Sequence, residues 1–330
     1  MSPAAVKALE KLSARRDYLA SIAVDSQEAR LLDLMRRVDQ AIGAIEVGDW
    51  GLCAVCHDFI SPESMDKDPL MSVCIGCMSE GDQRALERDL QSAARVQRTL
   101  LPPPRMEREG WEMAYLWEPR GLVSGDHVDL ILPEQPGAPL HLILGDVAGK
   151  GVAASFLQSH LHALFRALAP GGHTLPDLVA RANQLFADAT SATSYATLLA
   201  LRLESCGNLA MVNAGHPRPL LADGRGVRPV EGGGLPLGLF GASTYVERTL
   251  TLEPGQTLLF YTDGWTEGAV GDEEFGIGRA AAALRRSAAL PLPELLAACR
   301  ADLKAFLGAT AQSDDLTLVA LRRSEKTTIQ

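Results

Sequence analysis

The stretch LILGDVAGKGVAA, residues 142–154, places an aspartate and three glycines between a short apolar run and a run of small residues. The apolar run predicts a buried strand, and the residues after Gly151 predict the start of a helix. Gly149 and Gly151 allow a backbone turn that larger side chains would block. We therefore expect this strand to end by presenting Asp146 and the carbonyl of Val147 to a cation.

Eight short apolar or alternating runs, each bounded by Gly, Pro, Asp or Asn, predict strands in the second part of the chain. They are WEMAYLWEP, HVDLILP, PLHLILGD, YATLLALRLE, NLAMVNAG, YVERTLTL, QTLLFYTDG and DLTLVALRR. Helical patterns cover about 152–168 and 175–189 after the third run, and about 276–288 and 292–307 before the last. Strands separated from paired helices predict an α+β layered fold rather than strict βαβ alternation.

The first part of the chain has helical periodicity instead. Residues 1–47 carry apolar residues at spacings of three, four and seven, which predicts one or two amphipathic helices. Another helix is expected over about 80–101, ended by three prolines. Its apolar positions suit either a pairing seam between two copies of the chain or packing on its own domain; they are Leu86, Leu90, Ala93, Val96 and Leu100.

We expect four segments: amphipathic helices (1–47), a cysteine-rich segment (48–80), a linker helix (81–104) and a C-terminal domain (105–330). The 31 basic and 41 acidic residues give a formal net charge of −10, which argues against nucleic acid or an anionic membrane as partner of the whole chain. The sequence contains no run of about 18 consecutive apolar residues, so no membrane span is expected. The N-terminus is amphipathic and unlike a signal peptide, so we expect a cytoplasmic protein.

Four of the six cysteines form two pairs, Cys53 with Cys56 and Cys74 with Cys77, separated by 17 residues. Two such pairs predict the closed four-thiolate shell of one structural Zn²⁺. A segment with so little apolar mass would depend on the metal to fold. We expect the neighbouring His57 to be a bystander, and redox sensing by the thiols is the alternative. The other two cysteines, Cys206 and Cys299, are expected in the core.

The stretch AIEVGDWGLCAVCHDFISPESMDKDPLMSVCIGCMSE resembles the zinc finger of the DksA/TraR family over about residues 30–80. Members of that family bind RNA polymerase through a helical hairpin. No acidic hairpin tip is evident here. A structural or sensory finger is therefore the preferred interpretation, and polymerase binding is the alternative.

Further acids stand at strand ends: Asp126, Asp263, and Asp314 with Asp315. Singly, an aspartate in such a position is usually a turn or cap residue. Gathered with Asp146, these carboxylates would repel one another unless cations neutralised them. Because Mg²⁺ and Mn²⁺ prefer oxygen ligands, the set predicts a divalent metal site.

Six ordered motifs resemble the SpoIIE-like branch of the metal-dependent protein phosphatases, the PPM superfamily. They are VSGDHVD, GDVAGKGVAASF, NAGHPRPLL, GGGLPLGL, YTDGWTEG and SDDLTLVAL, and ARVQRTLLP resembles that branch's regulatory linker. The resemblance spans about residues 95–325. It implies a β-sandwich flanked by helix pairs, with two Mn²⁺ or Mg²⁺ ions at one edge. It also implies removal of phosphate from serine or threonine of a bacterial regulatory protein, such as an anti-sigma-factor antagonist.

The resemblance assigns roles residue by residue. Asp146 would bridge both ions and the Val147 carbonyl would join one of them. Asp126, Asp263 and Asp314 would supply further carboxylates and complete the catalytic set, with Asp315 the weaker member of its pair. Two ions then lower the pKa of a shared water, which attacks phosphorus in line.

Some positions depart from the family pattern. His127 and Val128 stand where the family has two aromatic residues; His127 either contacts the phosphate and leaving oxygen or, as we prefer, serves packing. Arg120 lies near an arginine of the family, and Lys150 could attract anions. The expected function is a phosphatase regulated by the N-terminal zinc-finger module. The alternative is a DksA/TraR-like regulator that binds the transcription machinery and carries a degenerate phosphatase scaffold.

Overall fold

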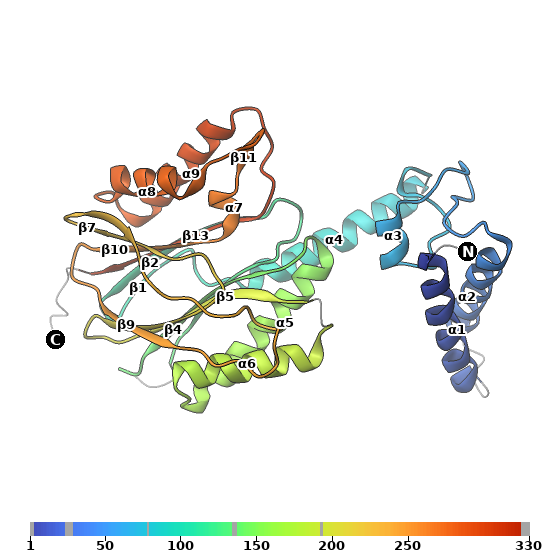
Figure 1. The fold of residues 1–330 in the computed structure, drawn as a ribbon, viewed down its shortest axis with the longest axis horizontal. Coiled ribbons are helices and arrows are strands. Elements are labelled where there is room, and N and C mark those ends of the chain that lie inside the picture. The colour runs from blue at the N-terminus through green and yellow to red at the C-terminus, as the bar shows by residue number, and fades with distance from the viewer. Residues whose placement is uncertain (1–2, 24–28, 78, 134–136, 192–193, 325–330) are drawn as a thin grey trace. The chain divides into compact units, whose positions relative to one another are not determined.

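The computed structural model describes residues 3–23, 29–77, 79–133, 137–191 and 194–324 (Figure 1). The chain divides into two compact units, Met1–Asp89 and Leu90–Gln330, with the division inside helix α4 (Glu80–Leu100). Within the described ranges, no helix is both long and apolar enough to cross a membrane.

The first unit begins with two helices, α1 (Pro3–Ala23) and α2 (Ala29–Val47), as the periodicity predicts. Leu12 and Val38 are buried between them and form the centre of a small apolar cluster. The cysteine-rich segment follows with helix α3 (Pro62–Lys67) and the 3-10 turn η1 (Ile75–Cys77). The side chain of Ser61 caps α3 by accepting a hydrogen bond from the Ser64 amide at 3.3 Å.

The second unit contains two large antiparallel sheets. The order in the six-stranded sheet is β1 (Arg105–Arg108), β2 (Trp111–Glu118), β13 (Leu316–Arg323), β10 (Thr257–Tyr261), β7 (Leu220–Asp223), β8 (Gly226–Pro229). The order in the five-stranded sheet is β3 (Asp126–Ile131), β4 (Leu140–Val147), β5 (Ala196–Leu203), β6 (Asn208–Ala214), β9 (Glu247–Thr251). One buried apolar cluster takes side chains from both sheets, so the sheets pack face to face.

A pair of helices covers the outer face of each sheet (Figure 1). Helices α5 (Val152–Leu168) and α6 (Leu175–Ala189) pack on the five-stranded sheet, with the 3-10 turn η2 (Ala169–Gly171) between them. Helices α8 (Gly276–Ser287) and α9 (Leu292–Leu307) pack on the six-stranded sheet. The short helix α7 (Asp263–Thr266) and the ribbon of β11 (Ala269–Val270) and β12 (Glu273–Glu274) lead into α8.

The predicted α+β sandwich flanked by helix pairs is therefore confirmed. All eight predicted strands and all four predicted helices of this unit are present. The pattern missed five strands of two to four residues, because so few residues cannot display an alternation; they are β1, β7, β8, β11 and β12.

Strand alternation decides which side chains face the space between the sheets. In β4, Leu142 and Leu144 belong to the cluster between the sheets, whereas Ile143 packs against the helices. Side chains two residues apart lie on the same face of a strand. Asp146 therefore continues the inner row of β4, and Asp126 continues the inner row of β3.

The C-terminal end of α4 belongs to the second unit and is hydrogen-bonded to the sandwich through Gln97, which is 4% exposed. Its amide nitrogen donates to the Ser124 carbonyl at 2.6 Å, and its amide oxygen accepts from the Ser124 N–H at 3.0 Å. The same nitrogen donates to Gln158 Oε1 of α5 at 3.1 Å. The end of the predicted linker helix is thus hydrogen-bonded to the loop that leads into β3.

Candidate functional site

The candidate site begins where β3 and β4 meet. Asp126 is the Cα partner of Asp146 in this antiparallel pair, and both side chains face the space between the sheets. Asp126 is 2% exposed. Gly125 is required beside them, because a Cβ there would lie 3.0 Å from the Val147 carbonyl oxygen and 3.6 Å from Asp146 Oδ1. The glycine thus lets the loop before β3 lie close to the two groups that the sequence singled out.

Two buried threonines from the opposite sheet hold the Asp126 carboxylate. Thr262 follows β10 and Thr317 lies in β13, and neither is exposed. Thr262 Oγ1 donates to Asp126 Oδ2 at 2.9 Å, and Thr317 Oγ1 donates to the same oxygen. Thr262 Oγ1 in turn accepts from the Thr317 amide at 3.0 Å. These bonds join the two sheets at the edge that carries the acids.

The six-stranded sheet brings the remaining acids to the same edge. Asp263 begins α7 directly after β10, and Asp314 and Asp315 immediately precede β13. Gly264 allows these two segments to touch, because a Cβ there would lie 1.9 Å from the Asp315 carbonyl oxygen and 3.4 Å from Asp314 Cβ. Close approach of the two segments therefore depends on a residue without a side chain.

Asp314 and Asp315 have different hydrogen-bond partners. The Asp315 carboxylate accepts from two backbone amides of the loop before β3, that of Arg120 at 2.7 Å and that of Gly125 at 2.8 Å. Asp314 Oδ2 instead forms an ion pair with Lys150 Nζ at 2.7 Å. Asp315 therefore holds the loop before β3, whereas Asp314 faces the ammonium group of Lys150.

The electrostatics show that these carboxylates repel one another. Burial, and then the charge of Asp146, raise the pKa of Asp126 well above its ordinary value. Burial, followed by the charges of Asp263 and Asp314, raises the pKa of Asp146 to about 8. Burial and Asp314 likewise raise the pKa of Asp263. Lys150 opposes the shifts of Asp146 and Asp263 but does not cancel them.

The donor set suits hard divalent cations. It offers carboxylate oxygens from both sheets together with the Val147 carbonyl, which are ligands that Mg²⁺ and Mn²⁺ prefer. Among the described residues, the side-chain groups with all ligand atoms within 4.8 Å of one another do not include these acids. The acids are thus less tightly gathered than the four cysteines, and Mg²⁺ held by only a few carboxylates keeps water ligands.

Sequence reasoning missed several residues around the acids. Thr262 and Thr317 were not singled out, although each stands within three residues of a motif aspartate. The sequence left open whether Lys150 attracts anions or is simply exposed, and its ammonium group pairs with Asp314 of the chain itself. Glu267 also belongs to this environment, since burial and then Asp263 raise its pKa. A buried hydroxyl next to a motif acid is the signal that could have found the threonines.

His127 faces away from the acids, as its place between Asp126 and Val128 requires. Its Nδ1 lies 2.8 Å from Gln158 Nε2 of α5, and the residue is 1% exposed. This placement agrees with the packing interpretation and not with contact to a phosphate. His216 is also buried, and its backbone N–H and carbonyl bond the Asn213 side chain at 2.8 and 2.9 Å, which shapes the loop after β6.

The expectation for the two remaining cysteines was half right. Cys299 of α9 is fully buried. Cys206 is exposed, so its assignment to the core was wrong. It lies in the short turn between β5 and β6, where the chain reverses at the surface.

In the first unit, the sulfurs of Cys53, Cys56, Cys74 and Cys77 lie within 4.8 Å of one another. Backbone N–H groups, that of Cys56 first and then that of Cys74, lower the pKa of Cys53 to about 6. The thiolate, the form that binds metal, is thus favoured at Cys53; the pKa of Cys56 is raised, and the hydrogen bond with Cys74 raises that of Cys77 to about 12. His57 is exposed and lies outside the group. The four sulfurs are thus positioned as a structural zinc site requires, and the small apolar cluster around Cys53 offers little else to order the segment.

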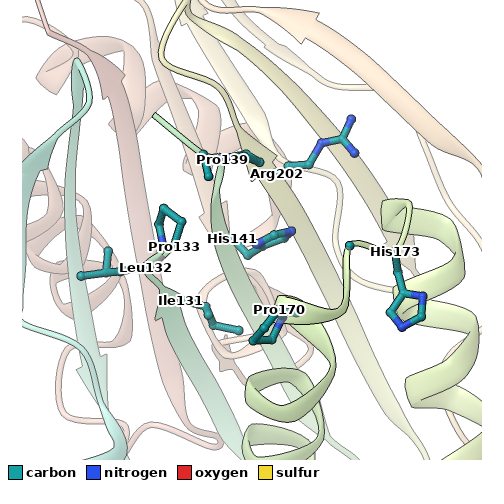
Figure 2. Close-up of a pocket in the computed structure, with 11 residues that line it drawn as sticks. Ile131, Leu132, Pro133, Pro139, His141, Pro170, His173 and Arg202 are labelled. Atoms are coloured by element: carbon teal, nitrogen blue, oxygen red, sulfur yellow. The ribbon is translucent and has the colours of Figure 1, made fainter. Parts of the chain in front are cut away.

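A cavity of about 420 Å³ lies at the other end of β3 and β4, where Ile131 pairs with His141 (Figure 2). Arg202 of β5 is the Cα partner of His141, and Pro170 and His173 from the segment after α5 also line the cavity. None of the described residues that line the cavity carries a carboxylate. It is separate from the edge that carries the acids.

Comparisons with known proteins agree with this geometry. The family model of stage II sporulation protein E (SpoIIE) matches residues 136–324. Protein IcfG of Synechocystis sp. is 26% identical over 266 residues, covering 72% of this chain and 42% of IcfG. The phosphoserine phosphatase RsbU of Bacillus subtilis is 22% identical over 190 residues, covering 57% of this chain and 56% of RsbU. The chain thus spans about half the length of these curated relatives.

Solved structures show the same fold. The SiaA-PP2C domain of Pseudomonas aeruginosa has a TM-score of 0.63 and 25% identity, covering 74% of this chain and 98% of that domain. The RsbU and RsbW domains of a Mycobacterium tuberculosis protein have a TM-score of 0.58 and 28% identity, covering 66% of this chain and 61% of that one. Since the SpoIIE model matches more than half of the residues, the chain belongs to the SpoIIE family and carries its PP2C-type phosphatase fold.

Proposed function

We propose that the chain is a metal-dependent protein serine/threonine phosphatase. The observation that carries the proposal is the meeting of Asp126 and Asp146 from one sheet with Asp263 and Asp314 from the other, with pKa values raised by burial and mutual repulsion. The similarity to RsbU, named a phosphoserine phosphatase, supports the reaction class.

The acids would hold two Mn²⁺ or Mg²⁺ ions. The residues that would hold them are Asp146, the carbonyl of Val147, and Asp126, Asp263 and Asp314. Such ions supply a water of lowered pKa and neutralise phosphoryl oxygens. Asp315 is the weaker ligand candidate, because both of its oxygens accept hydrogen bonds from backbone amides.

The other residues of the site keep these ligands in position. Thr262 and Thr317 fix one oxygen of Asp126 and leave its second oxygen for an ion. Lys150, which is about half exposed, is poised to exchange its ion pair with Asp314 for the phosphate of a substrate. No side chain is needed as a covalent nucleophile, because the water supplies the attacking oxygen.

The proposed substrate is a phosphorylated bacterial regulatory protein of the anti-sigma-factor antagonist type. The support is the similarity to RsbU and to the structure that contains RsbU and RsbW domains. The test is phosphate release by the purified chain from a phosphoserine antagonist protein, with Mn²⁺ and after chelation. Release should need Mn²⁺ and be lost in Asp146→Asn. Wild-type protein that releases none from a panel of such substrates would refute the assignment.

In this proposal the chain consists of four segments: a helical segment (1–47), a zinc finger (48–80) with one structural Zn²⁺, a linker helix (81–104) and the phosphatase domain (105–330). The spacing of the four sulfurs supports the finger. The finger would control the phosphatase through the linker helix. A DksA/TraR-like role in binding the transcription machinery is the second candidate, and it would be favoured by polymerase binding in a chain that lacks Mn²⁺-dependent activity.

We further propose that the linker helix forms a homodimer. Leu86 and Val96 of α4 are 44% and 61% exposed, and helical spacing places Ala93 and Leu100 near them. The double variant Leu86→Glu/Val96→Glu should be monomeric in sedimentation analysis. The matched control Arg88→Glu/Arg95→Glu changes charge at exposed positions of the same helix and should stay dimeric.

A further inference from the structure

A second group of potential metal ligands lies on the outer face of β3, opposite to the acids. His127 and Asp129 point from the strand toward α5, where His162 and Arg166 stand one turn apart. One ligand atom each from His127, Asp129 and His162 lie within 4.8 Å of one another. Asp129 is completely buried and His127 is 1% exposed.

The two histidines have unused ring nitrogens in this interior. Counting only the described part of the chain, His127 Nε2 and His162 Nδ1 are buried without a hydrogen-bond partner. A buried polar atom without a partner is unfavourable, so these two nitrogens call for a ligand. His162 Nδ1 also lies 3.3 Å from Asp129 Oδ2.

The spacing of the two rings is compatible with two ligands of one ion. Their centroids are 5.4 Å apart and their planes meet at 87°. A tetrahedral Zn²⁺ at about 2.0–2.1 Å from each nitrogen places two imidazole centroids roughly 5 Å apart. The present separation therefore needs only a small adjustment to admit an ion.

We propose that His127, Asp129 and His162 form a binding site for a first-row transition ion of the Zn²⁺ class. Imidazole and carboxylate are a common donor set for such ions. The site is distinct from the four cysteines and from the acids between the sheets. It would fasten α5 to β3 one residue away from Asp126, independently of the phosphatase activity.

Arg166 is the cation that such an ion must compete with. Its guanidinium donates to both oxygens of Asp129, at 2.9 and 2.6 Å. The side chain is 46% exposed, so it can withdraw into solvent. A carboxylate has about four acceptor positions, and Asp129 can therefore bind an ion while keeping one bond to Arg166. The positive charge of Arg166 lowers the affinity for the ion.

Gln158 sets the proton on His127. Its amide nitrogen donates to His127 Nδ1 in the present orientation, which leaves the proton on Nε2. An ion at Nε2 requires the proton on Nδ1, so the Gln158 amide must turn and give up the hydrogen bond that its oxygen accepts from Gln97. A carboxylate at position 158 would accept that proton without a turn, as in carboxylate–histidine–zinc arrangements.

The test counts zinc bound to the full-length protein in excess Mg²⁺, by elemental analysis after dialysis. We expect His162→Gln to bind one zinc equivalent less than the wild type. The control is His160→Gln on the same helix, where His160 packs on Phe186 and lies outside the group. Equal zinc content in His162→Gln and wild type would overturn the proposal.

Two further variants act in the opposite direction. Arg166→Gln removes the competing charge and should tighten zinc binding by at least about tenfold. Gln158→Glu should also tighten it. If His127, Asp129 and His162 bind no metal and only pair with Arg166 and protons, both variants should be less stable and zinc affinity should not change. If His162→Gln fails to fold, zinc-edge X-ray absorption of the wild type decides: imidazole scattering is expected beside sulfur, and its absence would refute the site.

Discussion

Asp126 and Asp146 are directly opposed on neighbouring strands, and both carboxylates point into the same narrow space between two sheets. A folded chain tolerates this arrangement only if protons or cations reduce the repulsion. The stability of the protein should therefore depend on pH and on divalent cations together.

Removal of the Asp146 charge should stabilise chelator-treated protein at alkaline pH. Folding raises the pKa of Asp146 from 3.8 to about 8. Its protonated form contributes fully to the free energy of unfolding below pH 3.8, and this contribution is lost as the pH rises through about 8. The melting temperature should fall over this interval, and Asp146→Asn should flatten the fall. Each 1 kcal/mol regained raises the melting temperature by about 2–4 °C.

Scanning calorimetry between pH 5 and pH 8, with the exposed Asp272→Asn as control, measures this effect. Mn²⁺ or Mg²⁺ should restore the wild type at pH 8 and should leave Asp146→Asn nearly unchanged. A wild-type melting temperature that rises steadily with pH in chelator would contradict the expectation.

Thr317→Val should weaken metal binding and leave the fold intact. The substitution keeps the shape of the side chain and removes the hydroxyl that donates to Asp126. Loss of a residue that orients a metal ligand costs about 10–100-fold in affinity or activity. The apparent Mn²⁺ dissociation constant, read from activity, should rise by this factor.

The control is Thr257→Val, a buried threonine that bonds Arg322 at 2.9 Å. It should lower stability with no change in the Mn²⁺ constant. Equal Mn²⁺ constants for Thr317→Val and the wild type would remove Thr317 from the site.

Gly264→Ala should destabilise the second unit. The new methyl group would meet the Asp315 carbonyl oxygen at 1.9 Å, so the segment before β13 has to move away from α7. Overpacking of this kind costs about 1–3 kcal/mol. Urea titration measures the loss, and Gly233→Ala, with no atom within 4 Å of its Cβ, should show none.

Cys56→Ser should unfold the cysteine-rich segment and release its zinc. Structural zinc contributes about 10–16 kcal/mol to the folding of comparable fingers, and the apolar cluster around Cys53 is too small to replace it. Zinc content and limited proteolysis report the change. The exposed Cys206→Ser should keep both the metal and the protease resistance of the wild type.

Much of the fold could be predicted because local patterns agreed with the final layers. The continuous apolar run of β4 marked a strand buried on both faces, and the periodicity of α5 and α6 marked one buried face of each helix, so their bounds could be read from the sequence. The role of Thr317 could not be read in this way. Its hydroxyl matters only because another sheet places Asp126 opposite to it, 191 residues away along the chain.

The orientation of His127 was in principle predictable. A residue between Asp126 and an inward-facing Val128 must point outward in a regular strand. The identity of the groups that it meets on α5 depends on how the helix packs, and spacing in the sequence does not encode that. The same holds for Lys150, whose ion pair with Asp314 joins segments from opposite sheets.

The Gln97 side-chain amide bonds both the backbone N–H and the backbone carbonyl of Ser124, and this pairing has a mechanical consequence. The end of α4 cannot move along or away from the sandwich by small steps. Any displacement would leave buried donors and acceptors without partners, and each unpaired group costs about 1–3 kcal/mol. The two hydrogen bonds therefore form or break together. A pull along α4 would break both at once, and the loop beside Asp126 would be released in the same event.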